Sequence, residues 1–154
     1  MITANTKGEK MKSLIKMIAV LMMAAAFIGC ASGPKYEEIA KTIPELSPNM
    51  ARIYIYRTAV LGAAVQPSVR VNDEVVGKAV PKGFFFVDRT PGNYKIKTST
   101  EVDRHLSLVL EPGQTRYVRL NISMGFFVGH VYPELVEETV GKQEISGCSY
   151  ADKK

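Results

Sequence analysis

The sequence predicts a mostly β protein, namely a small antiparallel β-sandwich of about seven strands with a short C-terminal helix, preceded by a signal helix and a tether. Three observations support this fold class. Hydrophobic and polar residues alternate in several segments after residue 50, which is the pattern of half-buried strands. Turn-forming residues separate these segments at fairly regular spacing. An apolar run before residue 30 stands outside this pattern and predicts a separate N-terminal element.

The apolar run is typical of an export signal. Lys12 and Lys16 supply positive charge before the uncharged run Met17–Ile28, which ends at Gly29 and Cys30. The 15 residues from Met17 to Ala31 would extend about 22 Å as a helix, whereas a membrane span needs about 20 residues. A cleaved signal is therefore favoured, and an uncleaved anchor or a buried core helix remain as alternatives.

The residues at the end of this run, Phe27-Ile28-Gly29-Cys30, resemble the lipobox of bacterial lipoproteins. The resemblance implies that the Cys30 thiol receives a diacylglyceryl group and that the chain is cut between Gly29 and Cys30, after which the new amine is acylated. Ala31 follows the cysteine, and the absence of Asp there implies transport to the outer membrane in the sorting pattern of lipoproteins. Met11 is a candidate for the natural start of the chain.

The expected organisation has three parts: a lipoprotein signal peptide at 1–29, a lipidated cysteine and tether at 30–50, and one β-sandwich domain at 51–154. A flexible tether of about 20 residues has a mean reach of roughly 25 Å. Part of the tether can pack on the domain instead, through Ile39, Ile43 and Leu46.

Charge and cysteine content exclude some classes of function. The whole chain has a net charge of +5, but residues 1–29 hold four lysines and one glutamate, which leaves +2 for residues 30–154. No basic block remains, so we expect no nucleic-acid partner. Lipidation of Cys30 would leave Cys148 without a partner cysteine, and we expect this thiol to be protected by burial.

The β-rich region contains segments of alternating hydrophobicity separated by turns. The segments expected to form strands are 51–56, 69–71, 74–80, 84–88, 94–100, 106–110, 118–122 and 126–136. Asn72-Asp73 predicts a tight hairpin, and Pro-Gly pairs at 91–92 and 112–113 predict type II turns. Pro133 favours an edge position for the last strand. Residues 139–145 are expected to form a short helix, and 149–154 a polar tail.

Several stretches of the chain together resemble a known family. They are SGPKYEEIAKTIPELSPNMARIYIYR, the VNDEVVG hairpin, the PGNY turn and VGKQEISGC near the end. These stretches resemble the bacterial lipoproteins that carry domain of unknown function 2846. The resemblance implies a small β-rich envelope domain and supplies no catalytic residues. The middle of the chain, from VRVNDEVVGKAV to RTPGNYKIKTS, also resembles the PEGA type of surface β-domain.

The residue types of a hydrolytic triad occur together at Asp103, His105 and Ser107. Alternate residues of a strand project in parallel about 6 to 7 Å apart, whereas a triad needs convergent side chains. We therefore expect a solvated strand face and no catalytic residues. His130 lacks neighbours at a metal-ligand spacing, so we expect no metal site and no cofactor.

A ligand-binding face is suggested by Arg52, Tyr54 and Tyr56, which alternate along one predicted strand. Tyrosine supplies flat apolar area, and arginine binds carboxylates and phosphates through paired donors. Residues of two other strands can extend this face: Lys95, Lys97, Tyr117, Arg119 and Asn121. The alternative is an ordinary polar exterior of an amphipathic sheet.

The sequence thus predicts an envelope protein held at the outer membrane by lipids on Cys30, with its domain facing the periplasm. We expect a non-enzymatic interaction or structural module that binds an envelope protein or peptidoglycan. One alternative is a receptor for glycan or lipid head groups, such as those of peptidoglycan or lipopolysaccharide, acting through the Arg52, Tyr54 and Tyr56 face. A hydrolase is the less favoured alternative.

Overall fold

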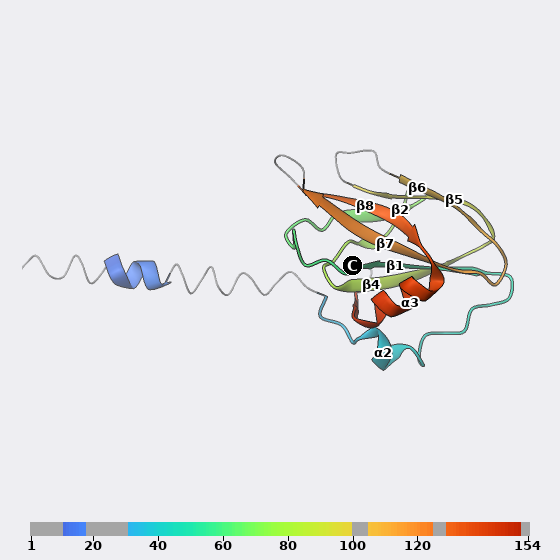
Figure 1. Cartoon of the computed structure of the whole chain (residues 1–154), viewed down its shortest axis with the longest axis horizontal. Helices are drawn as coiled ribbons and strands as arrows, with labels where there is room; N and C mark the ends of the chain where they lie inside the picture. The colour runs from blue at the N-terminus through green and yellow to red at the C-terminus, as the bar shows by residue number, and fades with distance from the viewer. Residues whose placement is uncertain (1–10, 18–30, 100–104, 125–128, 152–154) are drawn as a thin grey trace, which may run out of the picture.

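The computed structural model describes residues 11–17, 31–99, 105–124 and 129–151. Two β-sheets pack face to face, and two helices cover the outer side of one of them (Figure 1). This arrangement confirms the predicted small β-sandwich. Residues 11–17 form a short separate helix, and no helix in the described ranges has the length and apolarity that a membrane span requires. The predicted cleavage and lipidation site, Gly29 and Cys30, lies outside the described residues.

The first sheet has five strands in the order β8-β7-β1-β4-β9, and the second has four in the order β3-β2-β5-β6. Strands of the first sheet are β1 (Ala51–Arg57), β4 (Gly83–Arg89), β7 (Thr115–Met124), β8 (Gly129–Val136) and β9 (Ser149–Tyr150). Strands of the second sheet are β2 (Ser68–Val71), β3 (Glu74–Lys78), β5 (Gly92–Thr98) and β6 (His105–Leu110). The pairs β1–β7 and β4–β9 are parallel, so the first sheet is mixed rather than wholly antiparallel.

The predicted turns differ in what they connect. Asn72 and Asp73 both have positive φ, as a tight hairpin between β2 and β3 requires. The turn at 111–114 also forms, with Gly113 at φ +71° and a bond from Gln114 N to Glu111 O of 3.1 Å. Both Pro-Gly segments, however, carry the chain from one sheet to the other, because β4 and β7 belong to the first sheet and β5 and β6 to the second.

The main core lies between the two sheets and follows the predicted alternation. Ile53, Ile55, Phe85, Ile96 and Val118 are at most 2% exposed within it. Leu108 and Leu110 also point inward, as the pattern of β6 predicted. Burying one such side chain contributes about 1.5–3 kcal/mol, so this cluster is the principal source of stability.

A second core lies on the outer face of the first sheet, beneath α2 (Tyr36–Ile39) and α3 (Glu138–Ser146). Tyr54, Tyr56, Phe84 and Tyr117 are buried there against Ile145. The helix predicted at 139–145 is confirmed within a residue at each end. All seven residues of β1 are therefore buried, because both of its faces are covered.

The segment after residue 30 packs on the domain, which corrects the expectation of a flexible tether. Tyr36 N donates to Cys148 O at 3.0 Å, Tyr150 N donates to Pro34 O at 2.8 Å, and Lys35 forms a bridge with Ser149. Further along, Ile39 and Ile43 pack against the second core, as the alternative interpretation of this segment allowed. Strand β9 was not predicted, because two residues are too few to show alternation.

Candidate interaction site

The predicted ligand face of Arg52, Tyr54 and Tyr56 is formed on one side of β1, but it is not open to solvent. The three residues are 5%, 6% and 1% exposed, because α2 and α3 cover this side of the sheet. This corrects the expectation that the three side chains are presented to a glycan or lipid head group. For β1 it also corrects the alternative of a polar exterior, whereas Lys95 is exposed on β5 of the other sheet.

Arg52 already binds a carboxylate of its own chain. Its Nε and one Nη donate to Asp88 at 2.6 and 2.8 Å, and its guanidinium carbon lies 4.5 Å from the centre of the Phe86 ring. The hydrogen bond to Asp88 raises the pKa of Arg52. An outside carboxylate would have to displace Asp88, so Arg52 serves to stabilise the pairing of β1 with β4.

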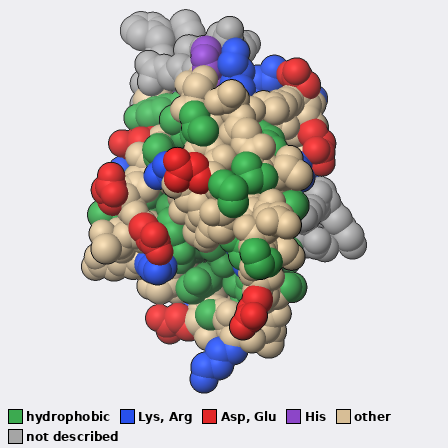
Figure 2. Space-filling view, turned by 90° about the vertical axis from the view of Figure 1, so that its right-hand side faces the viewer, with side chains coloured by type: hydrophobic (Ala, Val, Ile, Leu, Met, Phe, Trp, Pro, Cys, Tyr) green, Lys and Arg blue, Asp and Glu red, His purple; other side chains and the backbone are tan. Residues whose placement is uncertain are grey.

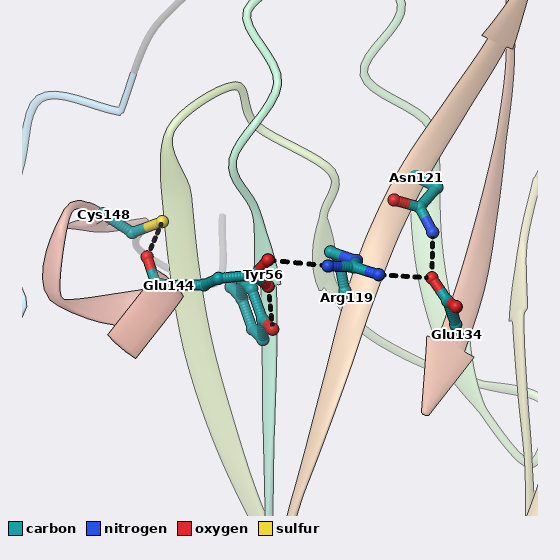
Figure 3. A network of polar contacts seen from close by, with 6 residues as sticks. All are labelled: Tyr56, Arg119, Asn121, Glu134, Glu144 and Cys148. Carbon is teal, nitrogen blue, oxygen red and sulfur yellow. Dashed lines mark hydrogen bonds and ion pairs between the residues drawn. The ribbon is translucent and has the colours of Figure 1, made fainter. Parts of the chain in front are cut away.

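A polar network joins α3 to the first sheet (Figure 3). Glu144 of α3 accepts from Tyr56 Oη at 2.7 Å and from Arg119 at 2.6 Å. Arg119 also donates to Glu134 of β8 at 2.9 Å, and Asn121 donates to the same carboxylate. Burial, with help from the bond to Glu144, raises the pKa of Tyr56, so this hydroxyl stays protonated. The network positions α3, and all its carboxylates are bound within it, although the buried Nε of Arg119 makes no hydrogen bond with any described residue.

Cys148 is fully buried beside this network, as predicted. Its Sγ lies 3.7 Å from Glu144 O and 3.9 Å from Arg57 O, the two carbonyls to which it donates. Burial raises the pKa of the thiol to about 11. Because the thiolate is the reactive form, Cys148 is protected from modification at neutral pH.

The residues considered for catalysis or metal binding do not form a site among the described residues. His105 and Ser107 are exposed on β6, and Asp103 lies outside the described ranges. No group of three or more His, Cys, Asp or Glu side chains that could hold a metal occurs in those ranges. His130 lies on β8, opposite Ser123 of β7.

An open groove of about 520 Å³ lies where β5 and β6 of one sheet approach β7 and β8 of the other. It contains two cationic side chains, Lys95 and Arg116, and no carboxylate, beside the exposed apolar side chains of Val109 and Leu135. The groove is lined by Asn72, Asn93, Tyr94, Lys95, Ser107, Leu108, Val109, Arg116 and Leu135. A neighbouring hollow of about 340 Å³ shares Arg116 and Leu135 but includes Glu137 and Glu138.

Arg116 is the residue of this groove most suited to an anion. Its Nε is buried and makes no hydrogen bond with any described residue, whereas most buried polar atoms are paired. Lys97, by contrast, lies outside the groove and donates to Asp73 at 2.6 Å. The groove can therefore accept a carboxylate or phosphate at Arg116 and Lys95 while apolar parts of a ligand contact Val109 and Leu135.

The model of the family described as "Protein of unknown function (DUF2846)" matches residues 47–131, which is more than half of the chain. The chain belongs to this family. It is also 27% identical over 151 residues to a protein of Haemophilus influenzae described as an uncharacterized protein, and the alignment covers 95% of this chain and 90% of that one.

The range matched by the DUF2846 family runs from just before β1 to the first part of β8. It contains every lining residue of the groove except Leu135. Helix α3 and β9, with Glu144 and Cys148, lie beyond it. The groove is thus mostly built by the DUF2846 region, whereas the cover of the second core comes from flanking segments.

Sequence reasoning missed Arg116 and Leu135 as groove residues. Both look ordinary in the sequence, since Arg116 is the second residue of one strand and Leu135 the last but one of the next. Their relation to Lys95 depends on which edges of the two sheets meet, and alternation within a strand contains no such information.

Proposed function

We propose that the protein is a lipid-anchored envelope protein whose β-sandwich acts as a non-enzymatic interaction module, held at the outer membrane and facing the periplasm. The proposal is supported by the basic, apolar and Gly29-Cys30 order of the N-terminal sequence. Several acyl chains on Cys30 would give durable attachment, because each buried methylene contributes about 0.8 kcal/mol.

The observation that carries the proposal is the docking of the segment that follows Cys30. Ala31 N donates to Pro81 O at 3.0 Å, beside the start of β4. Lipids on the preceding residue would therefore hold this end of the sandwich at the bilayer. The groove lies toward the other end of β1, where Arg116 pairs with Ile53. Figure 2 shows this far end, where hydrophobic side chains are interspersed with charged side chains of both signs. An interaction module needs such an exposed end.

Substituting Cys30→Ser should abolish acylation and move the protein out of the outer membrane fraction. For the native protein, intact mass should show a mature chain that begins at an acylated Cys30. For the variant, we expect an unmodified chain that is absent from the outer membrane fraction. Cys148→Ser is the matched control, since the Cys148 thiol is buried and should carry no lipid. An unmodified Cys30 in the native protein would refute the anchor, and an acylated protein confined to the inner membrane would refute the location.

The charge of the groove favours a carboxylate-bearing ligand, and the short peptides of peptidoglycan have that chemistry. Arg116 and Lys95 would bind the carboxylate, while Asn72, Asn93 and Ser107 offer further hydrogen bonds. This assigns the receptor function, the second candidate, to the groove instead of the buried face of Arg52.

Soluble peptidoglycan fragments should bind the domain, and Arg116→Gln should weaken that binding at least tenfold, which is about 1.4 kcal/mol. Titration calorimetry measures the dissociation constant, and chromatography of the recovered fragments should show them uncleaved. Lys97→Gln is the control. Lys97 lies on the same strand as Lys95, but its ammonium group is already paired with Asp73. Equal losses for both variants, or no binding by the native domain, would exclude this ligand.

A further inference from the structure

The loop between β1 and β2 is an uncharged, partly apolar segment on the surface. Residues 58–66, TAVLGAAVQ, contain no charged side chain. Val60 and Leu61 stand side by side in it and are 48% and 62% exposed. Val75 is a single exposed aliphatic residue within a strand, whereas Val109 lies beside Leu135 in the groove described above. Single exposed apolar residues are ordinary, but an adjacent pair in an uncharged loop needs an explanation.

The loop is held in shape by one fully buried cation. Arg57, at the end of β1, is 0% exposed and donates to the carbonyls of Ala59, Leu61, Gly62 and Val65 at 2.7 to 3.1 Å. Gly62 adopts φ +68°, which strains any residue with a Cβ, and lies against the end of the Ile122 side chain of β7. Four of the nine loop carbonyls are therefore satisfied from inside the protein by Arg57, and Ala63 O accepts from the side chain of Gln66 at 3.0 Å. Backbone groups that enter a lipid environment must be satisfied in this way.

The same arginine places the loop at the end of the sandwich that carries residue 31. Arg57 also donates to Ala79 O at 2.9 Å and lies opposite Gly83 in the β1–β4 pair. Pro81 lies between Ala79 and Gly83 in the sequence, and its carbonyl accepts from Ala31 N. Figure 1 shows the point where residue 31 joins the domain and the 58–66 loop at the same, left-hand end of the sandwich.

The surface beside the attachment point also suits a bilayer. A hollow of about 550 Å³ lies between residues 31–34 and Val80, Tyr150 and Ala151, and most of its exposed lining is apolar. Lys82 is exposed next to Pro81, where an ammonium group can meet anionic head groups. No carboxylate occurs among the residues of this hollow or of the 58–66 loop.

We propose that the 58–66 loop is a second membrane contact, which inserts Val60 and Leu61 into the head-group and acyl boundary beside the lipidated Cys30. This inference rests on the lipid anchor of the proposed function. Ala31 is hydrogen-bonded to the domain, and Cys30 is the residue immediately before it. The Cα atoms of neighbouring residues are about 3.8 Å apart. The anchor therefore brings this end of the sandwich onto the bilayer, and the loop fixes its tilt. A bilayer is a better occupant than a protein partner because the loop offers no charged group for specific recognition.

The test uses the full-length acylated protein with Leu61→Cys, labelled with an environment-sensitive fluorophore and reconstituted in vesicles of zwitterionic and anionic phospholipids. Cys148 is buried and Cys30 is acylated, so the new thiol is labelled selectively. Phospholipids brominated in their acyl chains should reduce the emission at least twofold, while iodide in the water has little effect. The matched control, Val109→Cys, lies toward the far end and should show the reverse pattern.

The outcomes separate the two proposals. Intact mass of the same sample reports acylation, and its absence overturns the lipid anchor itself. An acylated protein whose label at position 61 responds to iodide and not to brominated lipid overturns the membrane contact and leaves the anchor standing. A label that neither quencher reaches would indicate contact with a second copy, and this result also overturns the bilayer as the occupant.

Discussion

Replacing Arg57 with methionine will lower the free energy of unfolding by about 3 kcal/mol, a loss that only a few kinds of substitution cause. Methionine has a similar length and removes a buried charge, which by itself favours folding. The five carbonyls that accept from Arg57 would however remain, and each buried one left unsatisfied costs about 1–3 kcal/mol. Ala79 O is the most buried of these acceptors, whereas those in the 58–66 loop can turn toward water. The lost bonds therefore outweigh the relief of desolvation.

Urea unfolding of the protein solubilised in detergent measures this loss. Arg70→Met is the matched control, since Arg70 makes one exposed hydrogen bond, to Asp73 O at 2.7 Å, and its removal should cost less than about 0.5 kcal/mol. The Arg57 variant should also be cut by proteases within residues 58–66 while the rest of the domain resists. Equal urea midpoints for the two variants would contradict the role assigned to Arg57.

Gly141→Ala will destabilise the protein by about 1–3 kcal/mol, although alanine is the better helix former by about 1 kcal/mol. An added Cβ would lie 2.6 Å from Cδ1 of Tyr117 and nearer still to its Cγ and Cβ. Tyr117 cannot retreat, because its ring is buried and stacks on Tyr54 at 5.2 Å. Helix α3 would have to lift from the sheet, which breaks its contact at Glu144 as well.

Thermal unfolding monitored through the circular dichroism of the tyrosines measures this effect. Gly147→Ala supplies the control, since Gly147 has φ −82° and an added Cβ would come no nearer than 3.8 Å to Glu144 O. We expect the control to be neutral within about 0.5 kcal/mol. A Gly141→Ala protein as stable as the native one would mean that α3 sits further from the sheet than the structure has it.

The strands and the final helix were predictable because each depends on local alternation and turn chemistry. Ile53 and Ile55 face the main core as their spacing requires. Their neighbours Tyr54 and Tyr56 alternate in the same manner, yet they are buried, because a sheet face can be covered by helices that are remote in sequence. The available signal was the set of four aromatic residues among the outward positions of β1 and β4, since such faces are costly to expose: Tyr54, Tyr56, Phe84 and Phe86.

The candidate groove was not predictable in the same sense. Its residues come from four strands of two sheets and from the turn between β2 and β3. The Pro-Gly turns, which resemble hairpin turns, join different sheets. Only the three-dimensional order of strands brings Arg116 near Lys95. The burial of Arg57 was not predictable either. Its acceptors are backbone carbonyls, which every residue has, so no side chain in the sequence marks their position.

The hydrogen bonds from Tyr36 N to Cys148 O and from Tyr150 N to Pro34 O join the beginning of the domain to its end. A ribosome makes the chain from the N-terminus, so residues 34–36 exist long before residues 148–150 do. The two sheets can begin to assemble once β7 and β8 have emerged, but α2 gains these partners only when the last few residues are free. Closure of the second core therefore requires the C-terminal residues, and a chain truncated before residue 148 would lack both bonds and stay open on that side.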